Sequence, residues 1–221
     1  MRAPTIILDL DGTLLDEQPR HYGCYAAIMR ELGQEALPMD AYWSLKRQAV
    51  DARGVLAKTG SESLGARYEH RWLSLIESPE MLALDAPHVG TNDTLQTWVA
   101  AGASLMLTSL RQSAAGIDSQ LRSLGLARLF PRRAVVPPRE KAQGKAEAVR
   151  ALLQEGEVRR AVWIGDTEVD LCAARLLGCP AWMVTCGIRS AEFLQSLRPD
   201  RLAASLADFD PFDRTIGLES S

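Results

Sequence analysis

The sequence predicts an α/β fold, in which a Rossmann-like parallel sheet is flanked by helices and carries an inserted all-helical domain. Three observations support this prediction. After residue 89, short apolar runs alternate with amphipathic stretches of about ten residues, which is typical of βαβ units. A similar apolar run opens the chain, and the segment 17–88 between them shows only helical periodicity. A chain of 221 residues is long enough for one such core with a sizeable insertion.

The first part of the chain predicts one strand followed by helices. The apolar run at 5–8 ends at an Asp-Gly turn signal, as expected of a buried strand that feeds a loop. Apolar side chains at 21–32 fall on one face of a helix. Asp40 and Ser61 are expected to cap two further helices. We find no convincing strand pattern between residues 17 and 88.

The rest of the chain predicts alternating helices and strands. Helices are expected at 94–101, 113–124, 145–153 and 170–177, and strands at 103–107, 160–164 and 181–184, with a weaker strand at 135–136. Residues 1–16 and 89–221 should therefore form one α/β core, and residues 17–88 a separate helical domain. The tail from residue 208 onwards is expected to be peripheral.

Composition narrows the class of protein. The formal net charge is −3, so the chain lacks the basic surplus that is usual in nucleic-acid-binding proteins. No stretch approaches the roughly 20 apolar residues that span a bilayer. The N-terminus becomes acidic too early for a signal peptide, and we expect a cytoplasmic protein. The four cysteines form no CxxC pair and are expected to be free and buried.

A first acidic pair follows the opening strand, in the sequence Asp9-Leu10-Asp11-Gly12-Thr13. Residues i and i+2 of a strand project to the same side, so the two carboxylates should converge. They should do so at the carboxyl end of the strand, where open α/β sheets bind ligands. Two close carboxylates repel, and they need a cation or a shared proton. A simple strand end with an Asp-Gly turn is the alternative interpretation.

A second acidic pair follows the strand at 160–164. Asp166 and Asp170 lie four residues apart in a turn that leads into a helix, so both can face one site. Two strands that each end in paired carboxylates indicate an oxygen-rich site suited to Mg²⁺. Acidic residues that only stabilise the N-terminus of a helix are the structural alternative.

A hydroxyl pair and a lysine lie between the two acidic pairs. Thr108 ends the strand at 103–107 and Ser109 follows it, where hydroxyl and backbone N–H groups can hold a phosphate. Lys145 precedes a helix and can balance the charge of a phosphoryl group, and Lys141 is an alternative for that role. Helix capping and a solvated surface lysine are the ordinary interpretations of these residues.

Taken together, these motifs resemble those of the haloacid dehalogenase (HAD) superfamily, in its phosphatase-like branch with a helical cap after the first motif. The sequence DLDGT matches the first motif, Thr108 the second, Lys145 the third and GDTEVD the fourth, in the order of the family. The resemblance covers nearly the whole chain, and it implies that the segment 17–88 is the cap domain.

The resemblance implies a role for each acidic residue. Asp9 would be the nucleophile that becomes an aspartyl-phosphate. Asp11 would protonate the leaving oxygen and then activate the attacking water. The Asp9 side chain, the backbone carbonyl of Asp11 and the Asp166 side chain would hold Mg²⁺, with Asp170 supporting the metal or the lysine.

The resemblance also implies binding groups. Thr108 and Lys145 would bind the phosphoryl oxygens, with Gly12 and Ser109 beside them. His21 lies where several capped relatives carry a histidine near the hinge of the cap, so it is a candidate for contact with Asp11 or the substrate. Two cap arginines are further candidates for substrate contact, although a solvated helix face is their ordinary interpretation: Arg47 and Arg53.

The sequence therefore predicts a magnesium-dependent phosphatase that acts on a small phosphorylated metabolite, similar to phosphoglycolate or a sugar phosphate. The alternatives are a phosphomutase of the β-phosphoglucomutase type and a non-catalytic binding protein of the same fold. Because Asp11 is present, the haloalkanoate dehalogenase and phosphonatase branches are disfavoured. No pattern in the sequence indicates an oligomeric state.

Overall fold

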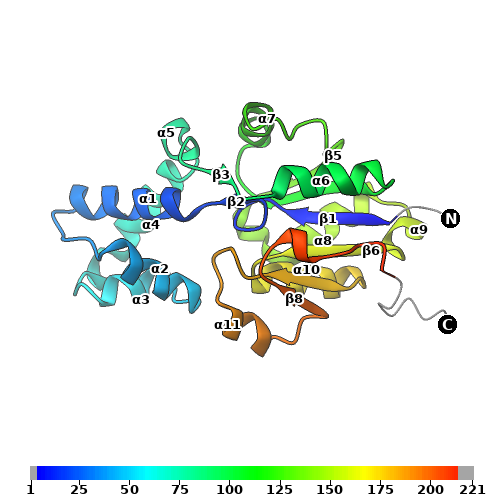
Figure 1. Cartoon of the computed structure of the whole chain (residues 1–221). Coiled ribbons are helices and arrows are strands. Elements are labelled where there is room, and N and C mark those ends of the chain that lie inside the picture. Colours follow the sequence, from blue (N-terminus) through cyan, green and yellow to red (C-terminus); the bar gives the residue numbers. More distant parts are fainter. Residues whose placement is uncertain (1–3, 214–221) are drawn as a thin grey trace.

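The computed structural model describes residues 4–213 and contains a six-stranded parallel sheet with helices on both faces (Figure 1). The strand order is β5-β4-β1-β6-β7-β8. The strands are β1 (Thr5–Asp9), β4 (Ser104–Leu110), β5 (Arg132–Val136), β6 (Ala161–Gly165), β7 (Ala181–Val184) and β8 (Arg201–Ala203). The predicted α/β class and parallel sheet are thus confirmed.

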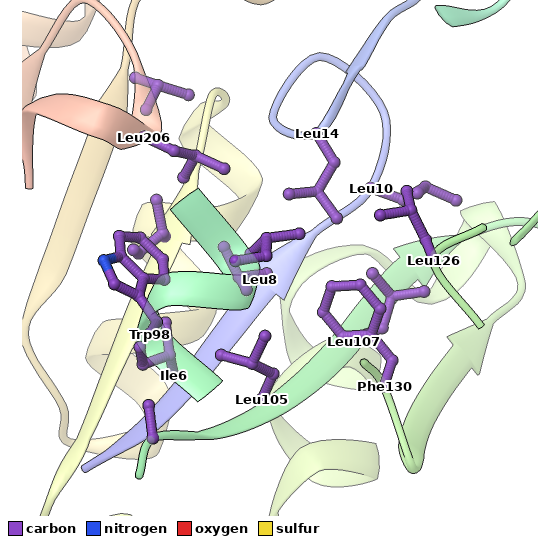
Figure 2. Close-up of a cluster of buried hydrophobic side chains, with 14 of the residues drawn as sticks. Ile6, Leu8, Leu10, Leu14, Trp98, Leu105, Leu107, Leu126, Phe130 and Leu206 are labelled. Atoms are coloured by element: carbon purple, nitrogen blue, oxygen red, sulfur yellow. The ribbon is translucent and has the colours of Figure 1, made fainter. Parts of the chain in front are cut away.

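Alternating side chains of the central strands supply two hydrophobic cores, one on each face of the sheet. Ile6 and Leu8 of β1 pack on one face, with Leu105 and Leu107 of β4 and with Trp98, as Figure 2 shows. This face is covered by α6 (Thr91–Ala100) and α7 (Ala114–Ser123). The opposite core contains side chains of α8 (Lys141–Leu152) and α10 (Glu168–Leu177). Burial of both faces explains the nearly continuous apolar runs of these strands.

The register of the sheet brings the polar ends of three strands together. β1 lies between β4 and β6, and Asp9 is paired with Thr108. Leu8 is paired with Ile164, so β6 ends beside β1 and Asp166 follows directly after it. The carboxyl ends of parallel strands therefore place both acidic motifs at one edge of the sheet.

Five α-helices of the segment 17–88 lie together at one end of the molecule, at the left of Figure 1. They are α1 (Gln18–Glu31), α2 (Met39–Arg47), α3 (Ala52–Ala57), α4 (Gly65–Leu75) and α5 (Pro79–Leu82), with a 3-10 turn at Glu62–Leu64. We call them the helical unit. It has its own aromatic core, in which the rings of Tyr25 and Tyr42 stack at 4.4 Å.

Two short strands connect the helical unit to the sheet. β2 (Leu15–Asp16) and β3 (Ala86–Pro87) pair antiparallel, with Leu15 opposite Pro87. The expectation of no strand between residues 17 and 88 is therefore wrong for β3. A strand of two residues is too short to show the alternation that identifies strands in a sequence. Division of the chain into separate domains at residues 17 and 88 stays a prediction.

Other sequence expectations differ from the structure in detail. The weak strand at 135–136 is a full strand, β5, and several short elements were not expected, among them β2, α5, β8, α9 (Glu155–Val158) and α11 (Ala191–Ser196). All four cysteines are free, but Cys172 is exposed because it lies on the outer face of α10. Burial raises the pKa of the Cys24 and Cys179 thiols to about 12. Among residues 4–213, no helix is long and apolar enough to cross a membrane.

Candidate active site

A cavity of about 290 Å³ lies between the carboxyl edge of the sheet and the helical unit. Asp9, Asp11 and Lys145 line it from the core, and His21 and Trp72 line it from the helical unit. With Asp170, which also lines it, the cavity brings together five of the predicted site residues, although 136 positions separate Asp9 from Lys145.

Lys145 lies between two carboxylates at the bottom of this cavity. Its Nζ donates to Asp9 and, at 2.6 Å, to Oδ1 of Asp170. The Thr167 hydroxyl donates to the other oxygen of Asp170 at 2.6 Å. Burial alone would lower the pKa of Lys145, but Asp170 and Asp9 outweigh burial and raise it, so the lysine is a cation. The alternative lysine, Lys141, is exposed at the start of α8.

Asp166 is completely buried and is held by the loops around it. It accepts a hydrogen bond from the Thr13 hydroxyl at 3.1 Å and one from the backbone N–H of Ile188 at 2.8 Å. Gly12 and Gly187 pack directly against its carboxylate, and a Cβ at either position would lie within 2.2 Å and 2.1 Å of Oδ2, respectively. Gly12 also has a φ of 75°, so both its backbone and its missing side chain are needed here.

These carboxylates fit a hard divalent cation. Asp9, Asp166 and Asp170 each offer an oxygen, and these oxygens all lie within 4.8 Å of one another. Burial, which outweighs Lys145, raises the pKa of Asp9, and burial together with nearby carboxylates raises the pKa of Asp166. Such a buried oxygen-only set is stabilised by a cation such as Mg²⁺.

The predicted hydroxyl groups lie beside the acidic cluster. The Oγ1 of Thr108 is buried, and it has no hydrogen-bond partner among residues 4–213. Ser109 donates a long hydrogen bond of 3.5 Å to Oδ2 of Asp11. A buried hydroxyl without a partner is uncommon in folded proteins, and it is available to an oxygen of a bound anion.

Asp11 has two arginine partners that the sequence analysis missed. Arg111 donates from Nε to Oδ2 of Asp11 at 2.8 Å and also donates from Nη2 to Oδ1, and Arg20 donates to the same Oδ1. Arg20 and Gln120 each donate to the buried Asp85 at 2.8 Å. Burial would raise the pKa of Asp11, but Arg111 and Arg20 outweigh burial and hold that pKa below its usual range. In this structure Asp11 is therefore an ionised carboxylate.

Signals for this network were weak in the sequence. Arg20 immediately precedes His21, and Arg111 lies two residues after Ser109, just past the end of β4, so both arginines are close in sequence to predicted site residues. Asp85 lies in the segment before β3 and follows no recognisable pattern.

His21 lies in the first turn of α1 and lines the cavity. Its Nε2 lies 3.2 Å from Oε2 of Glu17, one helical turn earlier, and its ring packs edge-on against Trp72 at 5.3 Å. Its Nδ1 is buried and has no hydrogen-bond partner within the described part of the chain. Among residues 4–213, therefore, no hydrogen bond joins the His21 ring to Asp11.

The two remaining substrate candidates lie elsewhere. Arg47 donates to the backbone carbonyls of Gly187 at 2.7 Å and Thr185 at 3.1 Å, so it joins α2 to a core loop and does not line the cavity. Arg53 is exposed on α3 and also lies outside the cavity lining. The helical unit lines the cavity with residues from the start of α1 and the end of α4, whereas Arg47 lies on α2 and Arg53 on α3.

Known hydrolases are similar to this chain in sequence. A family model described as haloacid dehalogenase-like hydrolase matches residues 3–178. A phosphoglycolate phosphatase from Caulobacter vibrioides is 27% identical over 219 residues, which cover 94% of this chain and 90% of that protein. A phosphoglycolate phosphatase from Yersinia pseudotuberculosis is 25% identical over 231 residues, which cover 97% of this chain and 94% of that protein.

Solved structures share the fold at lower sequence identity. A predicted phosphoglycolate phosphatase from Haemophilus somnus 129pt matches with a TM-score of 0.71 and 18% identity, over 94% of this chain and 96% of that chain. A haloacid dehalogenase-like family hydrolase from Streptococcus pneumoniae matches with a TM-score of 0.69 and 19% identity, over 93% of this chain and 95% of that chain.

Proposed function

The chain belongs to the haloacid dehalogenase-like hydrolase family and hydrolyses phosphoric monoesters, and we propose that it acts on those of small metabolites through an aspartyl-phosphate on Asp9. One observation carries this proposal: the Asp9 carboxylate faces the cavity beside a buried lysine, two further carboxylates and the unpartnered Thr108 hydroxyl. A nucleophile and a charge partner therefore line one cavity, and the free hydroxyl of Thr108 lies on the neighbouring strand, in register with Asp9.

In the first step, an oxygen of Asp9 attacks phosphorus, and the bond between phosphorus and the ester oxygen breaks. Lys145 offsets negative charge on the nucleophile and the phosphoryl group, and the Thr108 hydroxyl donates to a phosphoryl oxygen. For this step Asp11 has to leave its contacts with Arg20 and Arg111, which hold it ionised, take up a proton from solvent and pass that proton to the leaving oxygen. Water then attacks phosphorus, Asp11 accepts a proton from that water, and the bond to Asp9 breaks to release inorganic phosphate.

Mg²⁺ is the cofactor in this proposal. Asp9, Asp166 and the backbone carbonyl of Asp11 would hold it, and Asp170 would support it while bonded to Lys145. When bound, the cation supplies charge neutralisation between the anionic phosphate and the anionic nucleophile. The buried, oxygen-only donor set and the raised pKa of Asp9 and Asp166 support this assignment.

The helical unit is the cap of this enzyme in our proposal. The cavity is lined from both sides, and the paired strands β2 and β3 carry the two connections between the helical unit and the sheet. Movement at these connections would close the cavity and exclude water during transfer to Asp9. The cytoplasmic location expected from the sequence is also part of the proposal.

The similarity to phosphoglycolate phosphatases, at 25–27% identity, favours a substrate similar to phosphoglycolate over a sugar phosphate. The test is release of inorganic phosphate from p-nitrophenyl phosphate, 2-phosphoglycolate and glucose phosphates. We expect release with Mg²⁺ and its loss after exhaustive treatment with EDTA. Conversion of a sugar phosphate to its isomer without phosphate release would support a phosphomutase instead. No turnover of any ester with Mg²⁺ would contradict the proposal.

A further inference from the structure

The core loop at residues 185–190 is hydrogen-bonded to the helical unit. The loop follows β7 and precedes α11, and it lies against the carboxyl end of α2 (Figure 1). Arg47, the last residue of α2, donates from Nη1 to the carbonyl of Gly187 at 2.7 Å and from Nη2 to that of Thr185 at 3.1 Å. In return, the backbone N–H of Ser190 donates to the carbonyl of Arg47 at 2.9 Å. Arg47 therefore joins one end of α2 to the core.

Arg189 adds a second connection across the same boundary. Its Nη1 donates to the carbonyl of Lys46 at 3.0 Å. Its Nε and Nη2 donate to the two carboxylate oxygens of Glu168, at 2.7 Å and 2.8 Å. Glu168 is the first residue of α10 and lies two positions after Asp166, so this connection ends beside the acidic motif.

The opposite side of the same loop holds Asp166. The backbone N–H of Ile188 donates to Oδ2 of Asp166 at 2.8 Å, and the Thr13 hydroxyl donates to Oδ1 at 3.1 Å. Within residues 4–213, these two hydrogen bonds orient the Asp166 carboxylate. The loop at 185–190 therefore supplies one of the two.

Ile188 joins the two sides of the loop. Its side chain is 7% exposed and belongs to the buried cluster of the helical unit, together with Tyr25 and Tyr42, although the residue itself lies in a core loop. Its N–H, in contrast, binds a carboxylate of the core. If the helical unit moves away, the loop loses the burial of Ile188 and its hydrogen bonds with Arg47, and it has less to hold its N–H on Asp166.

The affinity of a carboxylate for a cation depends on the groups that orient it. Loss of one such partner typically weakens metal binding by roughly 10- to 100-fold. Two equilibria that share a structural element are thermodynamically linked, and each favours the other by the same factor. Here the shared element is the loop at 185–190, which contacts the helical unit on one side and Asp166 on the other.

We propose that Arg47 and Ile188 are positioning residues that couple the seating of the helical unit to the cation site. Asp166 keeps its orientation for Mg²⁺ while the helical unit holds the loop, and bound Mg²⁺ in turn holds the helical unit against the core. This inference rests on the metal site of the proposed function and adds the residues that connect that site to the helical unit. The coupling favours a complete cation site when the cavity is closed to water.

The alternative is that these contacts only hold the two units together. Their loss would then lower stability and leave the Mg²⁺ affinity of the folded protein unchanged. Calorimetric titration with Mg²⁺ alone separates the two cases, applied to the wild type, Arg47→Met, Arg47→Lys, Ile188→Ala and the control Arg67→Met. Arg67 is exposed on α4 and makes no hydrogen bond or ion pair within the described residues 4–213.

Hydrogen–deuterium exchange of α2, with and without Mg²⁺, is the second measurement. This helix contains no proposed ligand, so a change in its amide exchange reports transmission from the cation site. The comparison of the wild type with Arg47→Met shows whether the transmission passes through Arg47.

We expect Arg47→Met and Ile188→Ala to weaken the affinity for Mg²⁺ by roughly 2- to 30-fold, the range for residues along a coupling route. Arg47→Lys can still donate to one carbonyl and should lose less, and Arg67→Met should bind as the wild type does. In the wild type, Mg²⁺ should slow amide exchange in α2, and in Arg47→Met this slowing should be smaller.

Three results would overturn the inference alone. The first is wild-type affinity for Mg²⁺ in both Arg47→Met and Ile188→Ala, and the second is an equal loss in Arg67→Met. The third is exchange in wild-type α2 that does not respond to saturating Mg²⁺, which decides the question even where the variants do not fold. A wild type that binds no Mg²⁺ would overturn the metal site of the proposed function as well.

Discussion

Lys145 and Asp170 form a buried ion pair of 2.6 Å that joins α8 to α10 beside Asp9, the nucleophile of our proposal. The pair is nearly free of solvent, since the two side chains are 3% and 1% exposed. Because Lys145 also contacts Asp9, one cation serves two carboxylates that would otherwise face each other in a low-dielectric interior.

The first prediction concerns this lysine. Lys145→Met leaves Asp9 and Asp170 buried without their cation, and we expect it to lower the free energy of unfolding by about 3–5 kcal/mol in EDTA. Urea unfolding measures this change. The control is Lys141→Met, one helical turn away and exposed, which should change it by less than about 0.5 kcal/mol. Equal effects of the two variants would show that the buried pair contributes nothing to stability.

A second prediction concerns the close contact of Gly12 with Asp166. In Gly12→Ala the new Cβ would lie 2.2 Å from Oδ2 of Asp166, so the carboxylate or the loop has to move. We expect phosphatase activity to fall by at least about 10-fold and the affinity for Mg²⁺ to weaken, because one proposed ligand is displaced.

Gly33→Ala is the matched control for that experiment. Gly33 has a φ of 70°, close to the 75° of Gly12, but nothing lies within 4 Å of the position that a Cβ would take there. Gly33→Ala should cost about 1–2 kcal/mol of stability through backbone strain and leave activity intact. Loss of activity in both variants to the same extent would show that backbone strain, and not the contact with Asp166, matters.

A third prediction follows from the raised pKa of Asp166. Below the usual aspartate pKa of about 3.9, both the folded and unfolded states are protonated. As the pH rises above that value, the unfolded state ionises first, so the free energy of unfolding falls until the pH passes the raised pKa of the folded state. Urea unfolding in EDTA as a function of pH measures this loss.

Asp166→Asn removes that ionisation. Its free energy of unfolding should therefore decline less between about pH 4 and pH 8 than that of the wild type, and saturating Mg²⁺ should reduce the difference, since the cation favours the ionised carboxylate. Parallel curves for the two proteins in EDTA would contradict the raised pKa.

The positions of the two acidic motifs were predictable from sequence because the rules involved are local. An apolar run that ends in Asp9 and another that ends before Asp166 identify buried strands, and parallel strands bring their carboxyl ends to one edge. Thr108 and Lys145 could be located by their order in the chain relative to those strands. In the structure Thr108 is paired with Asp9 in the sheet, and Lys145 donates a hydrogen bond to Asp9.

The arginine network was not predictable in this way. The bond from Arg20 to Asp85 joins residues 65 positions apart, and that from Arg111 to Asp11 joins residues 100 positions apart. No periodicity specifies such contacts, which depend on how the helical unit sits on the sheet. For the same reason the sequence leaves Arg47 as a candidate either for substrate contact or for a solvated helix face, whereas in the structure it binds backbone carbonyls of the core.

The central claim is that Asp9, and not Asp11, carries the phosphoryl group, and trapping of the covalent intermediate tests it most directly. Asp11→Asn retains the nucleophile, and p-nitrophenolate leaves with little need for a proton, so attack on p-nitrophenyl phosphate should continue. Hydrolysis of the intermediate loses its base and should slow by roughly 10²–10⁴-fold. Asp9→Asn presents a neutral amide, which cannot form the acyl-phosphate.

Each variant reacts with excess p-nitrophenyl phosphate and Mg²⁺, the reaction is quenched rapidly, and intact-protein mass spectrometry then measures the added mass. Thermal unfolding of each variant is the control for folding. We expect one added phosphoryl group on Asp11→Asn and none on Asp9→Asn. A phosphoryl adduct on folded Asp9→Asn would contradict the account.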